Sequence, residues 1–520
     1  KYWGRGAVME QKELFKTKLG FILAAVGYAV GLGNIWRFPY VAYENGGGAF
    51  LVPYLFALLT TGIPLVILEY TIGHKYRGSG PLSFFRISPK WEWIGWWQVL
   101  ISFIVSTYFA VIVAWAVAYL YFSIGRQWGS GFDAHGKLAT EHFFYNDYLK
   151  ISGSEFELGG VTLGVILPLL FVWFLTMGIL YRGVRRGIEL ANKVFIPLLV
   201  ILMAIIVLRG ITLPGAGDGL NALFQPDWTA MFSGDVWAAA YGQIFFSVGV
   251  SWSLFIVFAS YLPRKSDINN SALVTAFSNS GFELFAAIGV FATLGFLATQ
   301  MNASVHEVVD DGIGLAFIVF PEIINQFPVY STVFGLVFFL SLVVAGLSTL
   351  VSICEAYVAA VMDKFHLSRS QAVTYSVGLS ALISILFSTG GGLYFLDAID
   401  YFINNFGLLL AGLAEAVFVV WIIRKADELQ AHANAVSDLP IGGWFKLFLG
   451  VFTPIALGYI AFSNFKTNVM SLYGGYKLSF VLIFGWGSAV LAIVSSLLLM
   501  KKSWPQMGEV HYVEGKERNF

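Results

Sequence analysis

The chain has 520 residues, of which 58% are hydrophobic and only 12% are charged, and its formal net charge at pH 7 is zero. A soluble domain carries about twice that share of charged residues, so the composition excludes a water-soluble globular protein. No basic segment marks a nucleic-acid-binding domain, and the single cysteine, Cys354, excludes an intramolecular disulfide. We therefore expect an all-α integral membrane protein that is surrounded by lipid and binds no nucleic acid.

Apolar stretches recur along the chain, and each is long enough to cross a bilayer as a helix of about 20 residues. We predict twelve spans, at residues 18–43, 48–73, 95–125, 161–181, 189–209, 236–262, 272–299, 329–362, 370–388, 393–423, 443–463 and 478–500. They form one domain over residues 1–520. Within it we expect a first five-span repeat at 18–209, a second at 236–423, and two further spans at 443–500.

Lys and Arg indicate how the spans are oriented, because short cytoplasmic loops carry an excess of positive charge. These residues gather near the N-terminus and in alternate loops, at 75–90, 182–186, 264–265, 364–369, 424–425 and 501–502. The pattern predicts a multi-pass protein of the plasma (inner) membrane with both termini in the cytoplasm.

The first span contains the sequence "GYAVGLGNIWRFPY" at 27–40, which places glycine, asparagine, arginine and proline inside an apolar helix. A break there would free backbone groups that are costly in hydrocarbon unless protein, water or a ligand satisfies them. Beyond Gly31, a second half-helix would present N–H groups and a positive dipole end, which suit a carboxylate. The first half, ending near Ala29 and Val30, would offer carbonyl groups to a cation.

The sixth span repeats this feature, because "FFSVGVSWS" at 245–253 places Gly249 and three serines in an apolar helix. Two interrupted spans at corresponding positions of two five-span halves indicate a secondary transporter with an inverted repeat. Small residues that merely allow close helix packing are the alternative. That alternative does not explain Asn34, Arg37 and Pro39.

Four stretches resemble the neurotransmitter:sodium symporter family, and in particular its bacterial leucine transporter. They are "GYAVGLGNIWRFPYVAYENGGGAFLVPY" (27–54), "GQIFFSVGVSW" (242–252), "GIGLAFIVFPEII" (312–324) and "AGLSTLVS" (345–352). The resemblance implies a prokaryotic symporter that carries a neutral amino acid into the cell with sodium by alternating access. It implies no enzyme activity and no organic cofactor.

The resemblance also implies two sodium ions. The first site would consist of Ala29, Asn34, Ser247 and Asn279, with the substrate carboxylate completing the shell. All of these are oxygen donors, as a hard cation requires. The second site would consist of Gly27, Val30, Ala345, Ser348 and Thr349. The last three share one helical face, although Ser and Thr on an apolar helix can instead bond back to their own backbone.

For the substrate, the resemblance implies that its carboxylate meets the N–H groups of Leu32 and Gly33 and the Tyr108 hydroxyl. Its ammonium group would face carbonyl groups of the two breaks. The remaining residues that line the pocket would be Tyr28, Ala29, Gly31, Phe246, Ser247, Gly249 and Trp252. Monoamine transporters of the family carry Asp at the position of Gly31, so glycine there favours an amino acid. Gly249 departs from the serine of the leucine transporter.

The resemblance assigns two gates and one compensating charge. Arg37 and Asp400 would close the outer side, while Lys12, Tyr261 and Asp363 would close the inner side. Glu283 stands where chloride-dependent relatives carry a serine. In those relatives the serine helps to bind chloride, together with residues that match Tyr54, Gln243 and Ser247 here. The Glu283 carboxylate would replace chloride, which predicts chloride-independent transport and admits proton antiport. A protonated glutamate hydrogen-bonded in the core is the alternative.

Other classes of function remain open from the sequence. A non-transporting amino-acid-binding or regulatory membrane protein of the same fold is the main alternative, and an ion channel and a membrane enzyme are less favoured. The sequence does not specify which amino acid is bound.

Overall fold

The computed structural model of the protein describes residues 13–132, 137–310, 312–327 and 329–504. These residues are almost entirely helical, and within them strand-like pairing is limited to two isolated bridges, Phe132 with Leu138 and Val161 with Thr389. Helices dominate because hydrocarbon offers no partner to a free backbone N–H or C=O group. The expectation of an all-α membrane protein is confirmed.

Within the described residues, ten helices are long and apolar enough to cross a membrane. They are Gly47–Tyr76, Pro89–Phe122, Leu163–Tyr181, Val184–Ile211, Ile268–Met301, Ser331–Phe365, Arg369–Ser388, Gly392–Ile422, Trp444–Gly475 and Leu478–Met500. An eleventh span is formed by α1 (Lys18–Ala29) and α2 (Leu32–Glu44), which are bent by 54° at a short break. The expected sixth span consists of two shorter helices, α11 (Gly234–Val248) and α12 (Leu254–Ser260), so a twelfth span stays a prediction.

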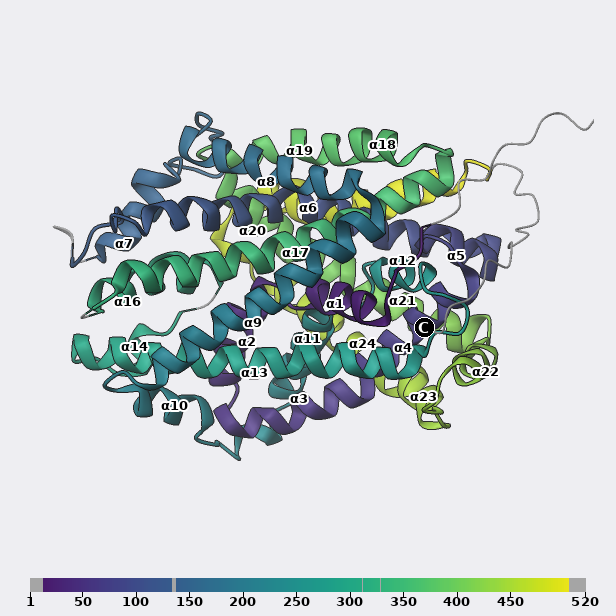
Figure 1. Cartoon of the computed structure of the whole chain (residues 1–520), viewed down its shortest axis with the longest axis horizontal. Helices are drawn as coiled ribbons and strands as arrows, with labels where there is room; N and C mark the ends of the chain where they lie inside the picture. The colour runs from purple at the N-terminus through teal and green to yellow at the C-terminus, as the bar shows by residue number, and fades with distance from the viewer. Residues whose placement is uncertain (1–12, 133–136, 311, 328, 505–520) are drawn as a thin grey trace, which may run out of the picture.

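Three long helices form the interior of the molecule: α6 (Glu92–Phe122), α13 (Ile268–Met301) and α17 (Ser331–Phe365). About four fifths of each apolar segment is buried, against 28% for the last span, Leu478–Met500. α17 packs along α6 and α9 (Glu189–Ile211), and α9 also packs along α13 and α1. Figure 1 shows α1 in the middle of this group. The two broken helices therefore lie inside the molecule.

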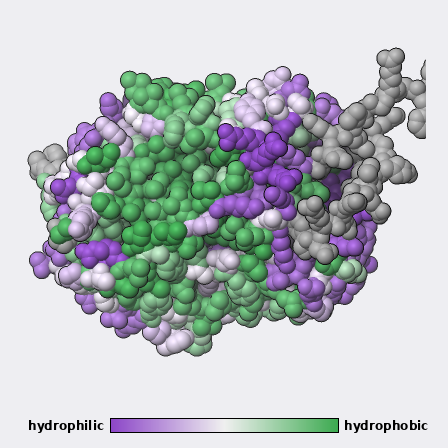
Figure 2. Space-filling model, in the orientation of Figure 1, coloured by the Kyte–Doolittle hydropathy of each residue, from purple (hydrophilic) through white to green (hydrophobic). Residues whose placement is uncertain are grey.

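The remaining helices surround this interior. Those used below are α4 (Ile63–Tyr76), α5 (Gly80–Ile87), α8 (Leu163–Tyr181), α20 (Gly392–Phe402) and α21 (Leu409–Val417). Further helices are α3 (Leu51–Ala57), α10 (Ala216–Phe224), α16 (Phe320–Gln326), α19 (Gly378–Ser384), α22 (Ala426–Val436), α24 (Thr453–Met470) and α26 (Gly487–Met500). Figure 2 shows hydrophobic residues gathered over the middle of one face, with hydrophilic residues toward its ends. This distribution is typical of a protein that spans a bilayer.

Candidate functional site

The first break lies at Val30 and Gly31, between α1 and α2. The Asn34 side chain closes the start of α2, because its Oδ1 accepts a hydrogen bond from the Gly31 N–H at 2.7 Å. The first N–H groups of a helix have no intrahelical acceptor, so those of Leu32 and Gly33 are available at the break. A Cβ atom built on Gly33 would meet no atom within 4 Å. Open space therefore adjoins the start of α2.

The second break covers residues 249–253, between α11 and α12. Gly249, Ser251 and Ser253 have positive φ angles of 78°, 69° and 66°. Such angles are uncommon for residues other than glycine and often mark functional sites. The Tyr28 hydroxyl on α1 donates a hydrogen bond to the Gly249 carbonyl at 2.8 Å. One side chain thus joins the two breaks.

The structure explains why position 249 is occupied by glycine and not by serine. Besides its positive φ, a Cβ atom built on it would lie 2.7 Å from Cε1 of Tyr28, closer than real Cβ contacts. The Tyr28 ring therefore occupies the space that a larger residue at position 249 would need.

Three residues expected at the first sodium site form a hydrogen-bonded chain across three helices. Asn34 Nδ2 donates to Asn279 Oδ1 at 2.8 Å, and Asn279 Nδ2 donates to Ser247 Oγ at 2.5 Å. Asn34 and Asn279 are buried. Ala29 is the last residue of α1, so its carbonyl is among the last four, which lack an intrahelical donor. The structure thus brings the side chains of this predicted site together next to the first break.

Residues expected at the second sodium site also meet, at the contact between α1 and α17. Ser348 Oγ lies 2.7 Å from the Gly27 carbonyl, and Thr349 Oγ1 donates to the Tyr28 carbonyl at 3.3 Å. These hydroxyl groups reach across to α1, so the alternative that they bond to their own helix is wrong. The other two expected ligands are also buried: Val30 lies in the break directly after α1, and Ala345 lies on α17.

The residues expected near the substrate and at the outer gate are connected. The Tyr108 hydroxyl on α6 donates to Asp400 Oδ1 on α20 at 2.7 Å. The Arg37 guanidinium lies over the Phe246 ring, 4.6 Å from its centroid, and is near enough to act electrostatically on Asp400. Tyr108 is expected to bind the substrate carboxylate. In this structure its hydroxyl group donates its hydrogen bond to the gate residue Asp400 instead.

Trp252, expected to wall the pocket, is held from α6. Its backbone carbonyl accepts a hydrogen bond from Ser102 Oγ at 2.8 Å. Trp252 is 9% exposed, and its indole N–H group has no hydrogen-bond partner among the described residues.

Glu283 lies fully buried on α13, one turn beyond Asn279. Its carboxylate accepts hydrogen bonds from the Tyr54 hydroxyl and from Gln243 Nε2 at 2.8 Å, and the Ser247 side chain lies near it. These are the three companions expected from the sequence. A negatively charged group at this point is therefore surrounded by donors and lies against one residue of the first predicted sodium site.

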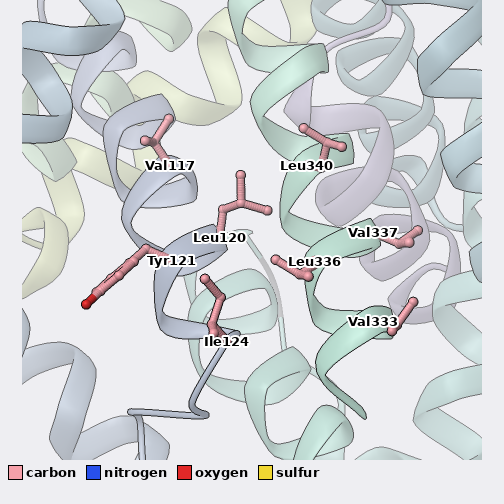
Figure 3. A pocket seen from close by; sticks show the side chains of 8 residues that line it. All are labelled: Val117, Leu120, Tyr121, Ile124, Val333, Leu336, Val337 and Leu340. Atoms are coloured by element: carbon pink, nitrogen blue, oxygen red, sulfur yellow. The ribbon is translucent and has the colours of Figure 1, made fainter. Parts of the chain in front are cut away.

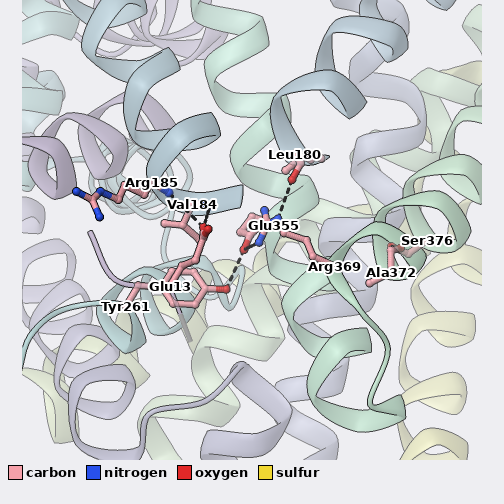
Figure 4. A network of polar contacts seen from close by, with 9 residues as sticks. All are labelled: Glu13, Leu180, Val184, Arg185, Tyr261, Glu355, Arg369, Ala372 and Ser376. Atoms are coloured by element: carbon pink, nitrogen blue, oxygen red, sulfur yellow. Dashed lines mark hydrogen bonds and ion pairs between the residues drawn. The ribbon is translucent and has the colours of Figure 1, made fainter. Parts of the chain in front are cut away.

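On the side predicted to be cytoplasmic, the polar contacts differ in part from the expected gate (Figure 4). Tyr261 Oη donates to Glu355 Oε1 at 2.8 Å, and Arg369 Nη2 pairs with Glu355 Oε2 at 2.6 Å. Arg369 Nε also donates to the Leu180 carbonyl at 2.7 Å. Glu355 and Arg369 were not anticipated, although a charge within a span needs a partner and could have indicated Glu355.

Of the other two members of the expected inner gate, one lies within the described residues and one outside them. Asp363 Oδ2 accepts a hydrogen bond from the Ser79 N–H at 2.8 Å. Lys12 lies outside the described residues, so its pairing with Asp363 and Tyr261 stays a prediction.

Two more polar residues that the sequence did not single out contact the breaks. Asn192 on α9 lies with its Oδ1 2.5 Å from Ser348 Oγ, so a third helix reaches the second predicted sodium site. Glu69 on α4 accepts a hydrogen bond from the Ser251 N–H at 2.5 Å. Both could have been found from the sequence, because each is a polar side chain inside an apolar span.

An apolar groove of about 540 Å³ lies elsewhere, between α6 and α17. Figure 3 shows its lining: Val117, Leu120, Tyr121, Ile124, Val333, Leu336, Val337 and Leu340. Neither broken helix contributes to it, and it has no charged group. It therefore does not fit a site for a zwitterion or an ion.

Comparison with known proteins agrees with this geometry. Residues 12–135 and 132–504 match the model of the sodium:neurotransmitter symporter family. An uncharacterized sodium-dependent transporter of Methanocaldococcus jannaschii is 42% identical over 498 residues, which cover 95% of this chain and 99% of that protein. The relatives of this chain are transporters and not enzymes, as the sequence led us to expect.

Two more distant relatives are named for the substrates that they carry. A sodium- and chloride-dependent glycine transporter 2 of Xenopus laevis is 29% identical over 91% of this chain and 67% of its own length. A sodium-dependent dopamine transporter of Caenorhabditis elegans is 29% identical over 89% of this chain and 82% of its own length. With the family model matching nearly the whole chain and a 42% identical relative matched end to end, the chain belongs to the sodium:neurotransmitter symporter family.

Proposed function

We propose that the protein carries a neutral amino acid into the cell together with sodium, by alternating access. The observation that carries this proposal is the meeting of the two breaks: Tyr28 binds Gly249, and the side chains of Asn34, Ser247 and Asn279 form one chain beside them. Helix ends at such a break supply N–H groups to an anion and carbonyl groups to a cation. A zwitterion and a sodium ion together need both.

Gly31 supports an amino acid over an amine. A Cβ atom at this position would lie 3.0 Å from Thr349 Oγ1, and glycine leaves this side of the break without a carboxylate of its own. The substrate would therefore bring the carboxylate that completes the first sodium shell. The names of the relatives include both glycine and dopamine, so family membership alone does not decide between the two classes.

Two sodium ions are proposed, with the ligands expected from the sequence. The first ion would bind at Ala29, Asn34, Ser247 and Asn279, and the second at Gly27, Val30, Ala345, Ser348 and Thr349. Because the substrate carboxylate would be a ligand of the first ion, each would raise the affinity of the other by the same factor. This shared ligand is the basis of the proposed coupling.

Chloride independence is proposed from Glu283. Its carboxylate, held by Tyr54 and Gln243 with Ser247 near it, would supply the negative charge that offsets sodium beside a zwitterion. Loss of sodium on the inner side would favour its protonation, so proton antiport accompanies this proposal.

The proposed setting is the plasma (inner) membrane with both termini in the cytoplasm. In that orientation Arg37, Phe246 and Asp400 would close the outer path. Tyr261, Glu355 and Arg369 would close the inner path, with Asp363 and Lys12 beside them.

The test is uptake into proteoliposomes. The purified protein should accumulate a radiolabelled neutral amino acid when sodium is high outside, and a panel of unlabelled amino acids should identify the substrate by competition. Accumulation without a sodium gradient would contradict symport. Saturable sodium-dependent binding without any uptake would instead support a binding or regulatory protein of the same fold.

A further inference from the structure

Asn192 reaches the second predicted sodium site from α9, a helix that supplies none of the ligands proposed above. The residue is 1% exposed, and its helix packs along both α1 and α17. Asn192 Oδ1 lies 2.5 Å from Ser348 Oγ, and Ser348 Oγ lies 2.7 Å from the Gly27 carbonyl oxygen. Three oxygen atoms from three helices therefore gather at one point inside the molecule.

The orientation of the Asn192 amide is determined by its own helix. Asn192 Nδ2 donates a hydrogen bond to the Ile188 carbonyl at 3.0 Å, so Oδ1 is the atom that faces Ser348. Turning the amide over would place Oδ1 against the Ile188 carbonyl oxygen, and two acceptors form no hydrogen bond. Asn192 therefore presents an oxygen atom, and not an N–H group, to the contact between α1 and α17.

These three oxygen atoms share a single hydrogen. A serine hydroxyl has one hydrogen to donate, whereas amide and backbone carbonyl oxygen atoms only accept. Ser348 can donate fully to Gly27 or to Asn192 but not to both, so one short oxygen–oxygen contact is left without a hydrogen. A cation held among the oxygen atoms removes this deficit, because oxygen atoms are the ligands that a hard cation prefers.

Gly27 allows Asn192 to come this close to α1. A Cβ atom built on Gly27 would lie 2.3 Å from Asn192 Oδ1 and 2.5 Å from Ser348 Oγ, closer than real Cβ contacts. A larger residue at position 27 would push both oxygen atoms away from the α1 backbone. The oxygen atoms from α9 and α17 thus lie directly against the helix that ends at the first break.

We infer that Asn192 is a further ligand of the second sodium ion, through its Oδ1 atom. The inference rests on the proposed function, because it adds one residue to a site proposed there. Asn192 contributes an uncharged oxygen, as do the carbonyl and hydroxyl groups already assigned to this ion. It extends the site from α1 and α17 to α9.

An ion held in this way ties three helices together. Sodium binds best when α1, α9 and α17 keep their present contact, and by reciprocity bound sodium holds α9 against the other two helices. Departure of the ion releases α9 as well as α1.

Equilibrium binding of radioactive sodium to the purified full-length protein tests the inference without transport. Asn192→Ala removes the ligand, whereas Asn192→Asp keeps the size of the side chain and adds a negative charge. The binding of one ion should weaken about tenfold in the first variant and strengthen about tenfold in the second. A residue that only joins helices by hydrogen bonds would not gain sodium affinity from the Asp substitution.

Asn405 offers the matched control. Its Nδ2 also donates to the carbonyl four residues earlier, that of Tyr401, at 2.8 Å, and its Oδ1 accepts a hydrogen bond from Asn464 on α24 at 2.8 Å. It repeats the bonding of Asn192, but at a contact with α24 and not with α1. Asn405→Ala and Asn405→Asp should therefore bind sodium as the wild type does.

Hydrogen–deuterium exchange gives a second readout, on the backbone of α9. Replacing potassium with sodium should slow exchange in residues 189–211 of the wild type. The slowing should be lost in Asn192→Ala and kept in Asn405→Ala, because only the first variant removes the link between the ion and α9.

Two results would overturn the inference and leave the proposed symport intact. One is a wild type and an Asn192→Ala variant that bind sodium equally well. The other is an Asn192→Asp variant that binds sodium no more tightly than the wild type, because Asn192 would then be a structural contact between helices. A wild type that binds no sodium at all would instead contradict the proposed function, and the inference with it.

Discussion

At Glu283, a single carboxylate is held by hydrogen bonds from Tyr54 and Gln243, next to the predicted ligands of the first sodium ion. Fixed donors of this kind bind any anion of suitable size, whether it belongs to the protein or comes from solution. The side chain at position 283 therefore decides whether the negative charge is permanent or must be recruited.

Replacing Glu283 by Ser should make uptake depend on chloride. The substitution opens space among Tyr54, Gln243 and Ser247 and removes the charge, so uptake should fall about tenfold or more when gluconate replaces chloride. Wild-type uptake should not change. Glu283→Gln is the control. Its amide fills the space without a charge, so chloride should not restore uptake by this variant. A Glu283→Ser variant that ignores chloride would contradict the charge substitution.

Introducing Asp at Gly31 should abolish high affinity for the amino acid. The new carboxylate would repel that of the substrate, and like charges placed together cost several kcal/mol, so we expect about a 100-fold loss in competition assays. Gly31→Ala adds only a methyl group 3.0 Å from Thr349 Oγ1 and should lose less. In the wild type, decarboxylated analogues should fail to compete; equal competition by an amino acid and its matching amine would refute the role of Gly31.

At the scale of elements, the two broken helices act as one unit. The Tyr28 hydroxyl joins α1 to the end of α11, and Glu69 on α4 fixes Ser251 within the second break. A movement of one broken helix therefore strains the other. α17 and α9 also meet α1, because Ser348 Oγ on α17 lies against both the Gly27 carbonyl and Asn192 Oδ1.

Gly249→Ala should disrupt this unit. The methyl group would add a strained positive φ, which costs about 1–3 kcal/mol, and would press on the Tyr28 ring. We expect the substrate affinity to fall about tenfold or more in an equilibrium binding assay. The control is Gly178→Ala on α8, where a Cβ atom would meet no atom within 4 Å. If both variants bind substrate as the wild type does, the geometry of the second break is not essential.

For the whole molecule, ligand binding at the centre should stabilise the packing of all helices around it. A ligand present at 100 times its Kd and bound only by the folded state contributes about 2.7 kcal/mol. Because the substrate carboxylate would be a ligand of the first sodium ion, stabilisation by the substrate should require sodium.

The melting temperature should therefore rise with substrate only when sodium is present. Thermal unfolding in detergent, with potassium replacing sodium in the reference, measures this difference. Asn279→Ala removes a side chain from the hydrogen-bonded chain of the first site and should weaken both the sodium and the substrate effects. A variant that keeps both effects unchanged would show that Asn279 is not part of a shared site.

The sequence alone determined the apolar spans, the position of the first break and the family, because span length, helix-breaking residues and a long motif are local properties of the chain. It also named Asn34, Ser247 and Asn279, which meet beside the two breaks. The partners across the fold were not readable: Tyr108 with Asp400, Glu355 with Arg369, and Glu69 with Ser251 are hydrogen-bonded or paired although most lie far apart in the chain.

Such pairs depend on how helices cross, and hydropathy does not encode the crossing. A buried carboxyl group in an apolar span signals that a partner exists but not which one. Gly249 shows the same limit: the sequence showed only that glycine stands where the leucine transporter carries serine, whereas packing shows that the Tyr28 ring occupies the adjacent space. The tertiary structure decided these contacts because each joins segments that only the packing of the helices brings together.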